Sequence, residues 1–209
     1  MLRRRSPRFF YALSAMVLLL ITLPYLYAWR AAGETHVFTG LLYNPLDGAS
    51  YFAKMRQGWE GAWRYRLAFT AEPGAGAFLF LYYLFLGHLA RLLHLAVPLT
   101  YHLARLAGTA VLLCALDAFY AAHLPLQARK TAFAIAALGS GMGWLMLPFG
   151  HVTADFSVPE AYPFLSAYVN PHFPLGLALM LLLLVPRPAG KRRMLTEGGM
   201  SLLLALISP

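Results

Sequence analysis

Acidic side chains are scarce in this sequence, and those with a plausible chemical role fall in two segments beside apolar runs. Asp47 stands in the first segment, shortly after Asn44, and Asp155 and Glu160 stand in the second. A carboxylate can act as a general base toward a hydroxyl or an amine, and converging carboxylates can hold Mg²⁺ or Mn²⁺. We therefore expect catalysis at Asp47 and an acceptor or metal site at Asp155 and Glu160, with no other cofactor indicated.

A second group of residues has the chemistry to bind a phosphate. Arg105 stands in an apolar run, where a guanidinium is costly unless it is paired or reaches an anionic group. His102 precedes it by one helical turn, and Glu72 stands just before another apolar stretch. The sequence predicts either a lipid phosphate or Glu72 as the partner of Arg105.

Several of these residues also have a structural interpretation. Asp47 has the side chain of a helix N-cap, and Glu72 suits a turn. The basic residues between the two, which are interleaved with aromatic residues, are interpreted as headgroup anchors. They are Lys54, Arg56, Arg64 and Arg66.

The composition predicts the kind of element that positions these groups. Of 209 residues, 60% are hydrophobic and 12% are charged, whereas an ordinary soluble domain carries about 25% charged residues. The net charge of +9 comes from short clusters beside apolar runs, which indicates membrane topology rather than nucleic-acid binding. A single cysteine, Cys114, excludes an intramolecular disulfide.

The apolar runs predict an all-α, polytopic transmembrane bundle, because lipid cannot satisfy open backbone groups. Within the run 131–149, the Gly139 to Gly143 spacing is interpreted as a close helix contact. The chain is expected to stop within its last helix. Spans are predicted near 9–29, 99–122, 131–149, 172–186 and, incompletely, 196–209.

The run 77–96 is predicted to be interfacial or re-entrant rather than a span. With the N-terminus inside, this threading keeps the basic loops near Arg129 and Arg187 on the cytoplasmic side. It also gives a long outer first loop with juxtamembrane helices, and it brings both acidic segments to the outer face. The expected location is the cell membrane, with membrane lipids as partners.

The order of these features resembles the N-terminal part of the GT-C-type membrane glycosyltransferases, including the protein O-mannosyltransferases and the RgtA-like enzymes. The segment from Asp47 to Trp63, with Tyr51 and Gly58-Trp59, resembles their acid, Tyr, Gly-x-Trp run. Thr70-Ala-Glu-Pro and His102-Leu-Ala-Arg-Leu stand where that family has a turn and the start of its next helix. The chain departs from the family at Gly48, where many members have a second acid.

The resemblance implies a hexosyltransferase that takes its sugar from a polyprenyl-phosphate donor and transfers it to an acceptor on the extracytoplasmic face. Asp47 would be the general base, and Arg105 would neutralise the leaving phosphate. Two alternatives remain open: a secondary transporter or channel that uses Arg105 and Asp117 within the membrane, and a noncatalytic membrane fragment. The sequence indicates no nucleic-acid partner and no particular oligomeric state.

Overall fold

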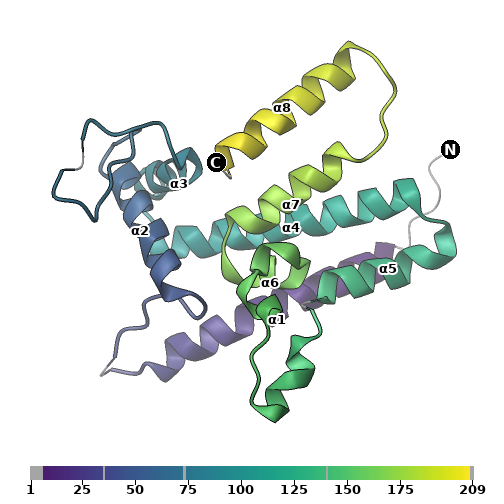
Figure 1. Cartoon of the computed structure of the whole chain (residues 1–209), viewed down its shortest axis with the longest axis horizontal. Coiled ribbons are helices and arrows are strands. Elements are labelled where there is room, and N and C mark those ends of the chain that lie inside the picture. Colours follow the sequence, from purple (N-terminus) through teal and green to yellow (C-terminus); the bar gives the residue numbers. More distant parts are fainter. Residues whose placement is uncertain (1–6, 35, 73, 140, 208–209) are drawn as a thin grey trace.

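The computed structural model describes residues 7–34, 36–72, 74–139 and 141–207, and in this part of the chain every regular element is helical. Four helices, α1, α4, α5 and α7, lie roughly along the long axis, and α2 and α3 cover one end of them (Figure 1). The elements are α1 (Pro7–Ala31), α2 (Pro45–Trp59), α3 (Leu81–Leu92), α4 (Val97–His123), α5 (Leu126–Leu138), the 3₁₀ helices η1 (Gly143–Phe149), η2 (Ala154–Ser157) and η3 (Pro159–Ala161), α6 (Pro163–Val169), α7 (His172–Leu183) and α8 (Lys191–Ile207).

Helices α1 and α4 are long and apolar enough to cross a membrane. They coincide with the spans predicted near 9–29 and 99–122. Leu13, Val17 and Ile21 recur every four residues on α1 and form one core with Leu112 and Leu116 of α4. Two of the predicted spans thus have the required length and composition.

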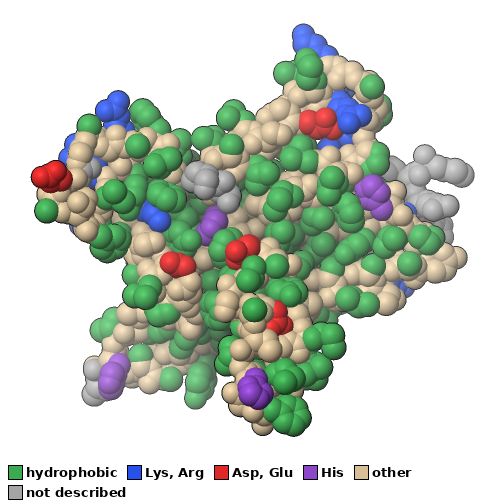
Figure 2. Space-filling view, in the orientation of Figure 1, with side chains coloured by type: hydrophobic (Ala, Val, Ile, Leu, Met, Phe, Trp, Pro, Cys, Tyr) green, Lys and Arg blue, Asp and Glu red, His purple; other side chains and the backbone are tan. Residues whose placement is uncertain are grey.

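Much of the molecular surface is apolar. Leu19 and Leu23 of α1 leave 59% and 55% of their surface exposed, although both belong to a helix apolar enough to cross a membrane. Figure 2 shows hydrophobic side chains over much of the visible face of the bundle. Exposed apolar surface on this scale marks a protein that contacts lipid or another protein. The chain is therefore membrane-associated.

The run 131–149 is not one straight helix. Helix α5 ends at Leu138, and η1 begins at Gly143 at an angle of 47°. Gly141 has φ +82°, and the Gly143 amide donates to an Asp155 carboxylate oxygen instead of continuing a helix. The prediction that Gly139 and Gly143 form a helix contact is wrong, because the glycines end the helix.

Helix α7 is shorter than the span predicted over 172–186. Its 12 residues cover about 18 Å, less than the ~30 Å of a hydrocarbon core. Helix α3, within the run 77–96 that was predicted to be interfacial or re-entrant, also has 12 residues. Its depth in a membrane stays a prediction.

The basic loops lie at one end of the bundle (Figure 1). The His123 ring at the end of α4 contacts the carbonyl oxygen of Leu184, which follows α7, at 3.1 Å. The Lys130 ammonium lies 5.8 Å from the ring centroid of Phe9, at the start of α1. Helices α2 and α3 lie at the opposite end with the first acidic segment, and the segment from η1 to α6, which carries the second, lies beside the middle of the bundle (Figure 1).

Helices α2 and α3 cross at two glycines. A Cβ atom on Gly58 would overlap the main-chain oxygen of Leu84, and one on Gly87 would overlap the main-chain oxygen of Met55. Moving the two helices apart to make room for one of these Cβ atoms would also break the close backbone contact at the other glycine. The two helices therefore approach each other more closely than any other side chain would allow.

Candidate functional site

Asp47 lies in the first turn of α2, with its side chain exposed. The N-cap position belongs to Asn44, so the N-cap interpretation of Asp47 is wrong. The Asn44 side-chain amide donates a hydrogen bond to the Asp47 carboxylate, and the Ser50 hydroxyl donates to the Asp47 main-chain oxygen at 2.8 Å. Asp47 is thus held in place while its carboxylate faces solvent.

Tyr51, one turn further along α2, connects the two acidic segments. Burial, followed in order of size by the charges of Asp47 and Glu160, raises the pKa of its hydroxyl to about 12. Burial also raises the pKa of Tyr43, with Glu160 again contributing. Asp47 and Glu160 are 113 positions apart in the sequence, yet both act on one hydroxyl. The charges of these two predicted site residues thus reach the same side chain.

Lys54 lies on the same face of α2 and is 6% exposed. Its ammonium lies 4.0 Å from the ring centroid of Phe80 and 4.6 Å from that of Tyr51, and it donates to the Ser50 hydroxyl at 3.3 Å. Burial lowers the pKa of Lys54, and the charge of Asp47 partly opposes that effect. Lys54 is a buried cation in the site rather than the headgroup anchor that the sequence predicted.

Lys54 was not predicted from the sequence to belong to the site, although its spacing from Asp47 and Tyr51 could have indicated it. Positions 47, 51 and 54 follow an i, i+4, i+7 pattern, which places them on one helical face. An acid, a tyrosine and a lysine on one face indicate a polar cluster. Lys54 was interpreted only as one basic residue among aromatic residues, and its helical spacing from Asp47 and Tyr51 was overlooked.

An aromatic floor lies under this cluster. The Tyr51 ring stacks on that of Tyr83 of α3, with centroids 4.4 Å apart and planes 10° apart. The Tyr83 hydroxyl is hydrogen-bonded to Nδ1 of His172 at 2.6 Å, and the His172 ring meets the Tyr51 ring edge-on. His172 opens α7, so α2, α3 and α7 meet at this point. These two residues were not predicted to belong to the site.

Arg105 is 1% exposed and lies in the core. Its terminal nitrogen Nη1 donates to the main-chain oxygens of Ile21, Ala167 and Tyr168 at 3.1 to 3.2 Å. Two of these carbonyls belong to the last turn of α6, where no further turn can satisfy them. A cation is favourable at a helix C-terminus. Arg105 therefore joins α1 and α4 to the end of α6.

His102 belongs to the same packing network. Its Nδ1 accepts a hydrogen bond from Arg105 Nε at 3.4 Å, so its Nε2 is the protonated nitrogen and donates to the Gly40 oxygen at 2.9 Å. The ring also meets that of Tyr25 edge-on. The roles predicted for Arg105 and His102 toward a donor phosphate stay predictions. In this structure their polar groups hold the fold, which does not favour the transporter alternative.

Glu72 and Asp155 lie in loops. The Glu72 side chain is exposed, and its main-chain amide donates to the Thr70 hydroxyl at 3.3 Å. Asp155 accepts hydrogen bonds from the Thr153 hydroxyl and from the Gly143 amide, and both lower its pKa, the hydroxyl more. Asp155 thus fastens η1 to η2. Among the described residues no ion pair joins Glu72 to Arg105.

A metal site needs several converging ligands. Over the described ranges, no three side chains of His, Cys, Asp or Glu come close enough to hold a metal ion. Asp47 and Glu160 contribute two carboxylates near the Tyr51 hydroxyl, and Lys54 lies on the same helix as Asp47 and Tyr51. This arrangement suits proton transfer better than the tight binding of a divalent cation.

The chain matches no protein-family model, no curated protein and no solved structure.

Proposed function

We propose that this chain is a multi-pass cell-membrane glycosyltransferase of the GT-C type, with its N-terminus in the cytoplasm. Its donor would be a polyprenyl-phosphate sugar, and its acceptor would be on the extracytoplasmic face. One observation carries the proposal: the charges of Asp47 and Glu160, from two distant segments, both contribute to the raised pKa of the Tyr51 hydroxyl. Helix α2, which carries Asp47 and Tyr51, lies at the end of the bundle opposite the basic loops (Figure 1).

The basic loops support this orientation. Lys and Arg are enriched in the short loops on the cytoplasmic side of a membrane. In this chain the start of α1, the α4–α5 turn and the α7–α8 loop lie together. The acidic cluster then faces outward. An acceptor could reach exposed Asp47 from water, while a lipid-linked donor approaches from the apolar sides of the bundle.

The proposed chemistry assigns one role to each polar group. The Asp47 carboxylate takes the proton of the acceptor hydroxyl as its oxygen attacks the anomeric carbon. The bond from that carbon to the phosphate oxygen breaks, and the polyprenyl phosphate leaves with the electron pair. Lys54, the buried cation that acts electrostatically on Asp47, offsets the charge that develops on the leaving phosphate. Glu160 orients the acceptor.

The test is transfer of labelled hexose from polyprenyl-phosphate hexose in membranes that contain the full chain. Asp47→Asn should lower the rate by about a hundredfold or more, as expected for loss of a general base. Glu34→Gln, at an exposed acid outside the cluster, is the matched control and should be unchanged. Because exposed Asp47 contributes little packing, the thermal midpoint should stay constant. A fully active Asp47→Asn protein would refute the assignment.

A further inference from the structure

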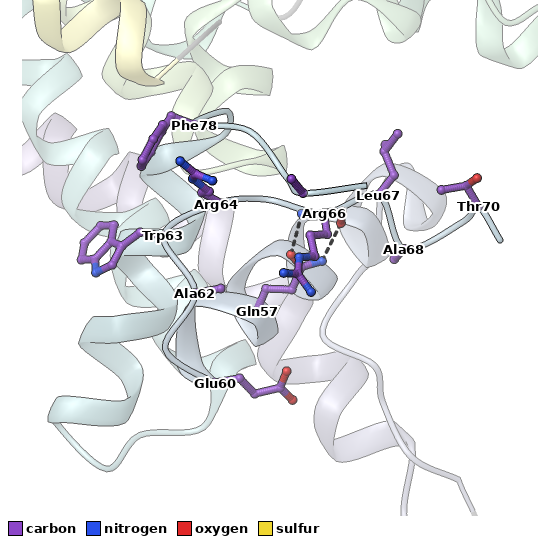
Figure 3. A pocket seen from close by; sticks show the side chains of 11 residues that line it. Gln57, Glu60, Ala62, Trp63, Arg64, Arg66, Leu67, Ala68, Thr70 and Phe78 are labelled. Carbon is purple, nitrogen blue, oxygen red and sulfur yellow. Dashed lines mark hydrogen bonds between the residues drawn. The ribbon is translucent and has the colours of Figure 1, made fainter. Parts of the chain in front are cut away.

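A hollow of about 790 Å³ lies between the end of α2 and the loop that follows it (Figure 3). Two guanidinium groups, of Arg64 and Arg66, lie in its wall. The Gln57 side chain donates to the Arg66 main-chain oxygen at 2.8 Å and accepts from the Arg66 amide at 2.9 Å. These two hydrogen bonds hold the loop backbone against α2 and fix the position of that side of the hollow.

The hollow is positively charged. Glu60 also lines it, but the Glu60 carboxylate is paired with Arg56 at 2.8 Å. Within the described ranges no ion pair involves Arg64 or Arg66. Figure 3 shows Arg64 beside Phe78, and its guanidinium carbon lies 5.2 Å from that ring centroid. Two guanidinium groups in this position suit a phosphate, whose oxygens match the Arg fork.

The hollow adjoins an apolar groove of about 670 Å³ between α3, α7 and α8. Trp63 and Phe78 line both spaces, so they form the passage from one to the other. The other residues of the groove are Leu81, Tyr82, Phe85, Leu175, Leu179, Leu203, Leu206 and Ile207. A cationic hollow that leads into an apolar groove fits an amphiphile with an anionic head.

The hollow is separate from the acidic cluster. Asp47 stands at the beginning of α2 and Gln57 ten positions further on, so about 15 Å of helix separates them. A phosphate at Arg64 and Arg66 is therefore too far from Asp47 to take part in the proposed transfer. This second site could therefore bind its ligand without any chemical reaction.

We propose that the hollow and the groove bind an anionic membrane phospholipid, with its phosphate at Arg64 and Arg66 and a hydrocarbon chain along α3, α7 and α8. Trp63 sits where headgroup and chain meet, a position that indole side chains favour. This site is independent of the proposed transferase function and is tested without measuring activity.

Native mass spectrometry of the full chain, purified in mixed micelles, measures which lipids stay bound. The unmodified protein should retain phosphatidylglycerol in preference to phosphatidylcholine. The double variant Arg64→Gln/Arg66→Gln should lose roughly tenfold or more of that preference, since each basic side chain near an anionic lipid contributes about fivefold in affinity. Lys191→Gln/Arg192→Gln, with the same loss of charge at the opposite end of the bundle, is the control and should keep the preference.

Four further results decide the proposal. Leu203→Trp fills the groove at a side chain that is 50% exposed and should lower retention of both lipids. Asp47→Asn should leave retention unchanged, which separates this site from the catalytic proposal. Displacement of phosphatidylglycerol by inorganic phosphate alone would indicate a simple anion site and overturn the lipid assignment. Equal retention in the double variant and the control would also overturn it.

Discussion

At the scale of single residues, Arg105 was recognised from sequence as a charge that needs a partner. The predicted partners were Glu72 and a lipid phosphate, whereas the structure supplies main-chain oxygens of α1 and α6. The two carbonyls of α6 accept because that helix ends after seven residues in the core. The residue at which a short helix ends depends on tertiary packing, so the sequence around Arg105 does not predict that the α6 carbonyls are its partners.

Asp155 gives a prediction for pH dependence. Its pKa is held below the ordinary value of 3.8 by the Thr153 hydroxyl and the Gly143 amide. Such a depressed pKa stabilises the η1–η2 loop above the unfolded pKa, and this contribution is lost as the pH falls through the folded pKa. Hydrogen exchange of peptides covering 143–157, corrected for intrinsic rates, should therefore speed up below about pH 4.

Asp155→Asn is the matched variant for this measurement. It keeps the size of the side chain but removes the titrating charge, so its loop should exchange rapidly at neutral pH and respond little to acid. Peptides of α4 should show no difference between the two proteins. A loop that stays equally protected at pH 6 and pH 3 in the unmodified protein would contradict the role given to Asp155.

At the scale of elements, α1 and α4 were predictable because an uninterrupted apolar run of sufficient length has few other stable solutions. The run 131–149 was not, because whether Gly139 to Gly143 forms a helix contact or a break depends on a distant acceptor, Asp155. The sequence predicted only that Asp47 and Glu160 share the outer membrane face. That the charges of both raise the pKa of Tyr51 depends on the tertiary fold.

The α2–α3 crossing predicts a large effect from a small substitution. Gly58→Ala and Gly87→Ala should each destabilise the protein by about 2 kcal/mol, since the new methyl group overlaps main-chain atoms of the other helix. Gly198→Ala is the control, because α8 leaves open space there, and it should be neutral or stabilising by about 0.5 kcal/mol. Thermal unfolding in detergent measures all three, and equal midpoints would refute the close crossing.

At the scale of the whole molecule, the charge distribution predicts a topology. Single cysteines in a Cys114→Ser background report which end of the bundle faces the outside of intact cells. Thr70→Cys and Ser157→Cys should react with an impermeant thiol reagent, because the proposed topology places both of their loops on the outer face. Lys130→Cys should react only after the membrane is opened.

The opposite labelling pattern would place the acidic cluster in the cytoplasm and remove the proposed access of an extracytoplasmic acceptor. Labelling of Thr70→Cys and Ser157→Cys from different sides would separate the two acidic segments. In both cases the lipid site at Arg64 and Arg66 could still be tested on its own, because it is built from the α2–α3 loop and from α2, α3, α7 and α8.

The network around Arg105 also sets an order of events during synthesis. A guanidinium within an apolar span costs about 3 kcal/mol to insert without partners. Ile21 and the Tyr25 ring have already been made when Arg105 leaves the ribosome, but Ala167 follows it by 62 residues. Of the three main-chain oxygens that accept from Arg105 Nη1, that of Ile21 is the one already made during that interval. We therefore expect α1 to pack against α4 before α6 is synthesised.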